Sequence, residues 1–352
     1  MRIAFVHPDA EGREEDVQKG FYPQNQLWGA DLLQAFGHEV RTIPTKCSTV
    51  ATKLGKFLNK LTGNRLCDFH IEFQVLVHSR GVELVYAPSG HLLLLPLLRR
   101  LGLFKPRIVT WFFRLPDCKK WWSLRVLRFS RYVLNGFDGV LCLTQKAASD
   151  FAAHSDEPEV QFIPWFADSR IFAPESQEDT GKYFLAVGKT RRDYATLLDA
   201  CSKVDAQFRI IAPKEVAQQT TIPPNVKFVE TSSDPPDAAI SYWELRDWYA
   251  NSIAVLVPLV EDPEDTSGYT SMLEAIQMRK PIIMTRSGCL DLNVEELGIG
   301  TFVLPGDSGS WVAALEQYRN RPPLPSSNFE KARSLYNSEN FGKLLNRFLL
   351  SV

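Results

Sequence analysis

The sequence has no hydrophobic run long enough to cross a membrane. Its most apolar segment, HLLLLPLLRR at residues 91–100, falls well short of the roughly 20 residues that span a bilayer. The first residues, MRIAFVHP, hold only four consecutive apolar residues, too few for the hydrophobic region of a signal peptide. We therefore expect a cytoplasmic protein without a transmembrane helix, and leave open a peripheral contact with the inner face of the membrane.

Other signatures are also missing. The six cysteines include no Cys-x-x-Cys pair and have no histidine at ligand spacing, so we expect reduced thiols, no bound metal and no resident cofactor. A formal net charge of −1 gives no sign of a nucleic-acid-binding surface. The first apolar run is followed by HPDAEGREED and not by Gly-x-Gly-x-x-Gly, which argues against a dehydrogenase.

Short apolar runs that alternate with helical patterns dominate both halves of the sequence. With 352 residues, of which 45% are hydrophobic, the chain is long enough for two cores. The alternation is typical of parallel sheets built from βαβ units, and predicts two doubly wound α/β domains joined near residues 164–182. The expected strands are residues 2–8, 38–44, 82–88, 107–113 and 138–144, then 183–188, 207–213, 226–230, 253–259, 281–285 and 300–305.

One helix is predicted over residues 23–37, PQNQLWGADLLQAFG. Its apolar residues recur on one helical face, its proline suits the first turn, and its final glycine suits the C-terminal cap. The residues expected on the buried face are Leu27, Ala30, Leu33 and Phe36.

The segment after the expected strand 253–259 is typical of a phosphate site. In TSGYTSMLEA, the residues Gly268, Tyr269, Thr270 and Ser271 would form the first turn of a helix, whose free N–H groups attract an anion. Glu274 would lie about one turn further on, where it can accept hydrogen bonds from ribose hydroxyls. The alternative is simple capping by Thr266 or Ser267, with Glu274 as an ordinary surface residue.

A basic turn follows the expected strand 183–188. It holds Gly188, Lys189, Arg191 and Arg192. A diphosphate needs cations and close approach of the backbone, and this turn supplies both. The alternative is a solvated basic turn.

These residues carry a resemblance to a known family. The pattern of a glycine, small hydroxyl residues, LEA, KP and an apolar strand resembles the donor site of retaining GT-B glycosyltransferases of family 4. The segments FIPWFADSRIFAP, LAVGKTRRDYATLLDA, ELRDWYANSIAVLVPL and LLQAFGHEV are similar to further segments of that family, in the family's order. The resemblance covers most of the chain.

The resemblance implies two Rossmann-like domains that face each other across a cleft. Residues 1–168 would form the acceptor-side domain and residues 169–330 the donor-binding domain. A C-terminal helix over residues 331–352 could pack back on the first domain. The implied co-substrate is a nucleotide-sugar, and the implied acceptor is a glycan, a lipid-linked molecule or a small molecule.

The resemblance also implies roles for residues of the donor site. Lys189 and Arg192 would neutralise the diphosphate, with Arg191 beside them, and Glu274 would hold the ribose. Gly20 would approach the donor from the first domain. The base would lie near residues 228–233, which include Phe228 and Val229.

Two departures from the family pattern put residue roles in doubt. Where some members carry a second glutamate, this chain has Thr266, so contact with the sugar could pass to Asp265, Glu264 or backbone groups. Where the family often has a histidine, this chain has Phe112. A functional histidine would then be His91 or His7, on the acceptor side together with Arg114.

Three alternatives remain open. In the first, Asp262 and Asp265 bind a divalent cation that carries the nucleotide. The second concerns the basic and aromatic segment 110–133, which could rest on an anionic membrane surface or bind a large polyanionic or lipid-linked acceptor, or could instead be a helix with a buried aromatic stripe and solvated cations. In the third, the protein is a non-catalytic sugar-nucleotide or glycan-binding module.

Overall fold

The structure is a computed structural model that describes residues 1–45, 50–62, 68–88, 92–113, 131–174, 181–231, 240–264 and 266–352. The chain forms two compact units, which are described separately below. The first unit holds Met1–Trp165 and Ser338–Val352, and the second holds Phe166–Asn337. Within these residues, no helix is long and apolar enough to span a membrane.

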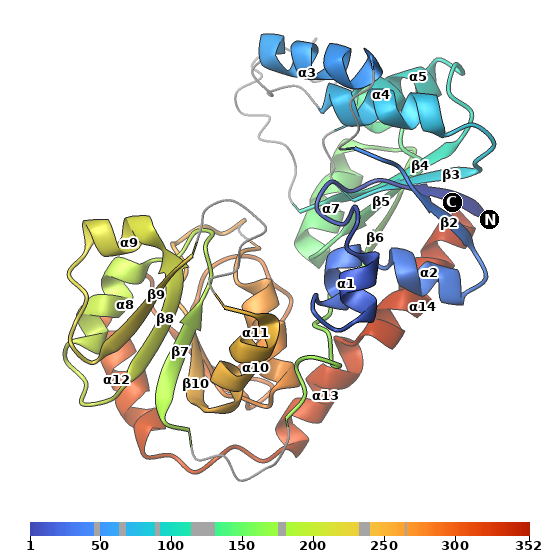
Figure 1. Ribbon diagram of the computed structural model, residues 1–352. Coiled ribbons are helices and arrows are strands. Elements are labelled where there is room, and N and C mark those ends of the chain that lie inside the picture. Colours follow the sequence, from blue (N-terminus) through green and yellow to red (C-terminus); the bar gives the residue numbers. More distant parts are fainter. Residues whose placement is uncertain are drawn as a thin grey trace. The chain divides into compact units, whose positions relative to one another are not determined.

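The first unit is built on a parallel sheet of six strands in the order β2-β1-β3-β4-β5-β6 (Figure 1). The chain starts near the middle of the sheet, so its order reverses between β1 and β3. That reversal is the topological switch point of this unit. The strands are β1 (Arg2–Phe5), β2 (Glu39–Thr42), β3 (Leu84–Ala87), β4 (Arg107–Phe112), β5 (Gly139–Cys142) and β6 (Glu159–Phe162).

Helices cover both faces of the first sheet. Ile71 and Val75 of α4, Leu95 of α5 and Phe151 of α7 are fully buried with strand residues in one core. The other face is covered by α2 and α14, where Phe341 stacks 6.1 Å from the ring of Trp111. The helices of this unit are α1 (Glu14–Gln18), α2 (Ala30–Ala35), α3 (Val50–Thr62), α4 (Phe69–His78), α5 (Leu94–Arg100), α7 (Gln145–His154) and α14 (Ser338–Ser351).

The expected continuous helix over residues 23–37 is wrong. A short 3-10 helix, η1 (Gln24–Leu27), ends at Trp28, whose φ is +53°, and α2 begins only after Gly29, whose φ is +80°. A Cβ at Gly29 would lie 2.7 Å from Leu345 Cδ2, so close packing of α14 requires glycine at this position. Phe36, at the C-terminal cap of α2, is 43% exposed and does not join the buried face.

The second unit holds another parallel sheet of six strands, in the order β12-β11-β10-β7-β8-β9. Its chain runs outward from β7 to β9 and then returns to β10 on the other side of β7. The switch point therefore lies between β7 and β10. The strands are β7 (Tyr183–Val187), β8 (Phe208–Pro213), β9 (Val226–Thr231), β10 (Ser252–Val257), β11 (Ile282–Thr285) and β12 (Gly300–Val303).

Helices also flank the second sheet. Leu197 of α8 and Trp311 of α12 are buried together with Phe184, Phe208 and Leu256 of the strands. The helices of this unit are α8 (Tyr194–Cys201), α9 (Lys214–Gln219), α10 (Tyr242–Ala250), α11 (Tyr269–Gln277), α12 (Ser308–Arg319) and α13 (Ser327–Leu335).

Every strand expected from an apolar run is present, so the doubly wound α/β class is confirmed. Strand β6 was missed. It lies at a sheet edge and none of its residues is fully buried, so it lacks the apolar run that marks the other strands. The helical pattern at the C-terminus is two helices, α13 and α14, and the chain passes from the second unit to the first between them.

Candidate functional site

The candidate site lies at the switch point of the second sheet. Strands β7 and β10 pair directly, and their carboxyl ends lead into the two segments that the sequence singled out. The first continues from Gly188 to Arg192, and the second from Pro258 to Gly268. In open α/β sheets, ligands bind at such a switch point, beyond the carboxyl ends of the strands.

Backbone hydrogen bonds hold these two segments against each other. Asp193 N donates to Pro258 O at 2.9 Å, and Val260 N donates to Arg191 O at 3.1 Å. Between these bonds, Arg192 and Leu259 form an isolated antiparallel bridge. The cationic turn after β7 is therefore fixed to the segment that leads into α11.

The guanidinium of Arg192 lies over Gly188. A Cβ at Gly188 would be 2.5–2.7 Å from three guanidinium atoms, so only glycine leaves room for this side chain. Arg192 Nη1 donates to Thr190 O at 2.8 Å, and the buried Tyr194 hydroxyl donates to Gly188 O at 2.8 Å. These contacts hold the cation at the end of β7.

The N-terminus of α11 reaches the same point. Gly268 has φ +90°, and a Cβ there would lie 2.8 Å from Val257 Cγ1 and 3.3 Å from Leu259 Cδ2. Ser271 Oγ donates to Val187 O at 3.0 Å, which joins the first turn of α11 to the last residue of β7. Arg192 pairs with Leu259, which also lies against Gly268, and Ser271 bonds to the last residue of β7. Arg192 and the first turn of α11 therefore converge at the carboxyl end of β7.

The residue at the N-cap position of helix α11 has no side chain with which to cap it. Its N-cap is Gly268, so the alternative in which Thr266 or Ser267 caps the helix is wrong. Thr270 is exposed, whereas the side chain of Tyr269 is buried with its ring 6.2 Å from that of Tyr336. Of these two residues, only Thr270 presents its side chain at the surface.

Glu274 is buried, so the alternative in which it is an ordinary surface residue is wrong. It is 6% exposed, and its Oε2 accepts a hydrogen bond of 2.7 Å from the Tyr249 hydroxyl. Burial raises the pKa of Glu274 to about 7, and the Tyr249 hydrogen bond opposes this rise. A buried carboxylate that titrates near neutrality is typical of functional sites.

Tyr249, from α10, connects the parts of the site and was missed in the sequence. Burial and then the charge of Glu274 raise its pKa, while the nearby Arg192 cation acts in the opposite direction. Glu274 and Arg192 therefore both lie within electrostatic range of one buried hydroxyl. Nothing in WELRDWYANS marks this tyrosine, because it resembles any apolar residue on the inner face of a helix.

The acidic segment after β10 is partly engaged by an arginine. Arg191, with φ +52°, donates from Nη2 to Asp262 Oδ2 at 2.7 Å. The Asp262 carboxylate also accepts a hydrogen bond from Glu264 N. Among the residues that the structure describes, no group of three His, Cys, Asp or Glu side chains could hold a metal ion. Asp265, the other residue of the metal alternative, lies outside them.

The remaining expected donor residues are less closely gathered. Lys189 is exposed directly after Gly188, and Thr266 is half-buried before α11. Phe228 and Val229 lie on edge strand β9, which β8 separates from β7, and Phe228 packs against the core. Gly20 belongs to the first unit, in the turn after α1, where its N–H donates to Val17 O.

The switch point of the first unit gathers aromatic side chains. His7 follows β1, and its ring lies 5.2 Å from that of Trp28. Trp28 also lies 4.6 Å from Trp165 and 5.9 Å from Phe113, which is 38% exposed. Tyr86 donates from its hydroxyl to Trp28 O at 2.9 Å. This aromatic cluster was not foreseen from the sequence.

Burial lowers the pKa of His7, and Asp9 opposes this effect, so the imidazole is neutral at pH 7. Its Nδ1 is buried and has no hydrogen-bond partner among the described residues. The other two expected acceptor-side residues, His91 and Arg114, lie outside the described residues.

A pocket of about 310 Å³ lies beside the candidate site, at the carboxyl ends of β10 and β11. Its lining includes Glu261 and Pro263 after β10, and Arg286 and Ser287 after β11. Ser287 Oγ accepts a hydrogen bond from Asp262 N at 2.9 Å, which joins the pocket to the segment held by Arg191. A pocket therefore lies next to the segment that Arg191 holds through Asp262.

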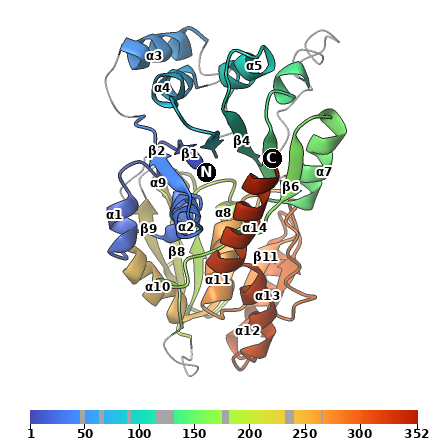
Figure 2. The same cartoon turned by 90° about the vertical axis from the view of Figure 1, so that its right-hand side faces the viewer.

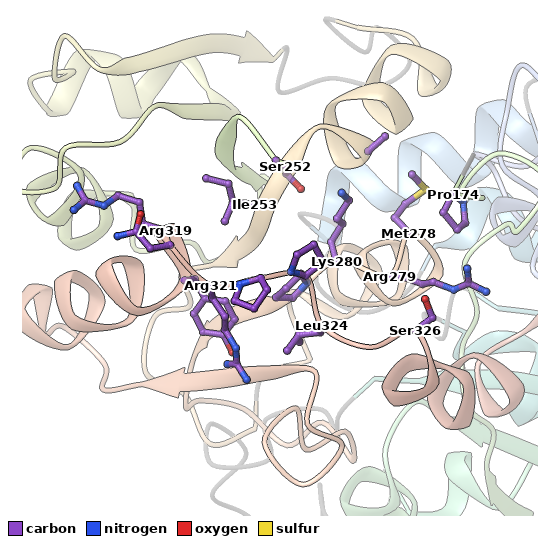
Figure 3. A pocket seen from close by; sticks show the side chains of 17 residues that line it. Pro174, Ser252, Ile253, Met278, Arg279, Lys280, Arg319, Arg321, Leu324 and Ser326 are labelled. Atoms are coloured by element: carbon purple, nitrogen blue, oxygen red, sulfur yellow. The ribbon is translucent and has the colours of Figure 1, made fainter. Parts of the chain in front are cut away.

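A larger pocket, of about 410 Å³, lies at the opposite end of the second sheet (Figure 3). It includes Ser252 and Ile253 at the start of β10, together with several cations. Two of these cations, Arg279 and Arg319, form ion pairs with Glu330 and Glu316. Because parallel sheets bind ligands at their carboxyl ends, this pocket is a weaker candidate for the site.

Comparisons with known proteins show the fold. No protein-family model matches the chain, and no curated protein matches it in sequence. Sucrose-phosphate synthase from Thermosynechococcus elongatus is similar in structure, with a TM-score of 0.67 at 16% identity over 100% of this chain and 98% of that one. HepE from Anabaena, in complex with UDP-glucose, gives a TM-score of 0.65 at 15% identity over 100% of both chains.

WaaG, a glycosyltransferase involved in lipopolysaccharide biosynthesis, is also similar, with a TM-score of 0.57 at 14% identity over 97% of this chain and 99% of that one. The prediction of a GT-B fold with two Rossmann-like domains is confirmed.

Proposed function

We propose that the protein is a retaining glycosyltransferase that resembles family 4. It moves a sugar from a nucleoside-diphosphate sugar to a hydroxyl of a glycan, a lipid-linked molecule or a small molecule, without a metal ion. The observation that carries the proposal is the convergence of Arg192 and the N-terminus of α11 on the end of β7. A fixed cation beside the N-terminus of a helix suits a diphosphate.

The main catalytic contribution is electrostatic. When the bond between the sugar and the diphosphate breaks, negative charge builds up on the departing phosphate. Arg192, Lys189 and the amides of Tyr269, Thr270 and Ser271 stabilise that charge. Because Arg192 and the helical amides are fixed before the reaction, they lower the barrier and not only the energy of the bound substrate.

Two further steps complete the proposal. Glu274 holds the ribose of the donor, and Tyr249 positions its carboxylate. The donor phosphate accepts the proton of the incoming hydroxyl on the face that the leaving group vacates, which retains the configuration at the sugar carbon. NMR of the first product formed tests this directly, because inversion of the anomeric carbon would exclude a retaining transferase.

The similar structures support a nucleotide-sugar as donor. HepE has been determined with UDP and with UDP-glucose, and WaaG is described as a glycosyltransferase. Binding of the same kind of donor by this chain is our proposal.

A thermal-shift screen of UDP, GDP, ADP and their sugars is the first test. A ligand that binds the folded state stabilises it by about 2.7 kcal/mol at a hundred times its dissociation constant. We expect one nucleoside diphosphate to raise the melting temperature, and its sugar to be hydrolysed or transferred. The same assay with a chelator tests metal independence, since loss of activity would restore the alternative with Asp262 and Asp265.

A non-catalytic sugar-nucleotide or glycan-binding module is the second candidate. It is favoured by Thr266, which stands where some family members have a glutamate, and by Phe112. The Phe112 ring is buried 5.1 Å from that of Phe151, so this position serves the core. A thermal shift without hydrolysis or transfer would support this candidate.

The proposal includes the location of the protein in the cell. We propose that the protein is cytoplasmic and contacts the membrane peripherally through segment 110–133, most of which lies outside the described residues.

A further inference from the structure

Helix α3 forms an extra layer of the first unit, outside α4. It contacts α4, and none of the α3 side chains that the structure describes belongs to the core between the sheet and its helices. Both views show α3 on the side of α4 that is turned away from the sheet (Figures 1 and 2). A Cβ at Gly55 would lie 2.3 Å from His70 Cα, so the two helices approach backbone to backbone. Asn59 Nδ2 adds a hydrogen bond of 2.7 Å to Asp68 Oδ1.

The outward face of α3 is apolar. Val50 is 85% exposed, Leu54 is 49% exposed and Phe57 is 61% exposed. Residues spaced by three and four positions lie on one side of a helix, so these side chains form one stripe. The fold does not need this stripe for its own core, and a contiguous exposed apolar surface marks an interaction site.

Positive charges lie beside the stripe. Lys53, Lys56 and Lys60 are exposed, and at 3.6 residues per turn they line one flank of the apolar face. The helix contains no aspartate or glutamate. Its outer surface therefore combines an apolar stripe with charge of one sign only.

We propose that α3 docks the protein on an anionic lipid bilayer, lying in the plane of the membrane surface. The apolar stripe enters the boundary between headgroups and acyl chains, while the lysine stems extend to the lipid phosphates. The 13 residues of α3 are too few to span a bilayer, but they suit a helix that lies on its surface. Charge complementarity favours lipid phosphate over a neutral surface as the partner.

Vesicle sedimentation tests this inference without any sugar donor, so its outcome is independent of the proposed function. We expect the full chain to sediment with phosphatidylcholine vesicles that contain phosphatidylglycerol, and much less with phosphatidylcholine alone. Each lysine near such a surface contributes about 1 kcal/mol, so the combined change Lys53→Gln, Lys56→Gln and Lys60→Gln should lower the partition coefficient about 100-fold. Leu54→Ser with Phe57→Ser should lower it at least about tenfold.

Two control variants carry the same chemical changes elsewhere. The first combines Lys182→Gln, Lys214→Gln and Lys331→Gln, which removes the same charge from exposed sites in the second unit. The second combines Leu304→Ser and Leu335→Ser, at leucines that are 59% and 46% exposed. Both should sediment like the unchanged protein.

Three results would overturn the inference. One is a lack of sedimentation with anionic vesicles, and another is an equal loss in the lysine control. The third is unchanged sedimentation of the α3 variants, which would move the contact to another segment, such as 110–133. All altered side chains are exposed, and equal circular dichroism spectra and melting temperatures will show that the variants are folded.

Discussion

In the second unit, the segments after β7 and β10 bring an arginine, two glycines and a helix N-terminus to one point. In the first unit, the corresponding switch point gathers His7, Trp28 and Phe113. Both sheets are parallel with six strands, so the backbone does not cause this difference. The same architecture offers cations and amides for an anion in one unit, and aromatic faces with a neutral imidazole in the other. We infer that donor diphosphate and acceptor are divided between the two units in this way.

The largest expected effect comes from Arg192 in the second unit. Removing one preorganised group that stabilises charge in the transition state costs about 2.7–4 kcal/mol, so Arg192→Ala should lower kcat about 100- to 1000-fold. Lys189→Ala should also lower transfer by orders of magnitude, and both variants should fold normally. Steady-state kinetics with the donor found by thermal shift will measure this.

Arg319→Ala is the matched control, because Arg319 lies at the opposite end of the same sheet and pairs with Glu316. It should leave turnover unchanged. Normal turnover of the Arg192 and Lys189 variants would show that these cations do not take part in the mechanism. It would also contradict the assignment of the donor diphosphate to the second unit.

The buried carboxyl group of Glu274, which the proposed function requires, should lower the stability of the protein when it is ionised. Burial raises its pKa to about 7 from the 4.5 of an exposed glutamate, so the folded state binds a proton more tightly than the unfolded state. The contribution of Glu274 to stability is therefore most favourable below pH 4.5 and is lost as the pH rises through about 7. The loss is about 3 kcal/mol when complete. Glu274→Gln should remove this loss, and should lower transfer because the ribose contact changes.

Urea unfolding at pH 5 and pH 8 tests the sign. Glu274→Gln should gain stability over the unchanged protein mainly at pH 8, and an equal difference at both pH values would contradict a raised pKa. Glu295 provides the opposite case, because the hydrogen bond from Phe302 N holds its pKa below the usual range. Its contribution is present above pH 4.5 and is lost as the pH falls through its lowered pKa.

Gly268 tests the placement of the helix N-terminus. Gly268→Ala brings a Cβ to 2.8 Å from Val257 Cγ1 at a φ of +90°, so the first turn of α11 has to shift. We expect a loss of about 1–3 kcal/mol in stability and about tenfold weaker diphosphate binding. In Gly306→Ala the φ is +66° and no atom lies within 4 Å of the new Cβ. Calorimetry should show that this control loses stability but keeps its affinity for the diphosphate.

His7 in the first unit should have the smallest effect. Loss of one hydrogen bond to an acceptor hydroxyl costs about 1 kcal/mol, so His7→Gln should raise the KM for the acceptor about fivefold. Donor affinity should stay the same. Since burial lowers the His7 pKa, activity should decline only below pH 6.5 in the unchanged protein, and this decline should be absent in the variant. A change in donor affinity would contradict the division between the units.

The sequence predicted the sheets well, and it marked the two segments that meet after β7 and β10, for a physical reason. Buried parallel strands require continuous apolar runs, and glycine next to cations or small hydroxyl residues is a local signal. Contacts between distant segments left no such signal. The Tyr249–Glu274 hydrogen bond joins α10 to α11, and the break at Trp28–Gly29 depends on Leu345 of α14. Local periodicity at residues 23–37 favoured one helix, and packing overrode it.

The most direct test of the central claim is calorimetric binding of UDP, GDP and ADP and of the matching nucleosides, to the unchanged protein and to Arg192→Ala. The account predicts that one diphosphate binds and that Arg192→Ala weakens its binding about 10- to 100-fold, while the affinity for the matching nucleoside does not change. Equal affinity of both proteins for that diphosphate, or no binding of any diphosphate, would contradict it.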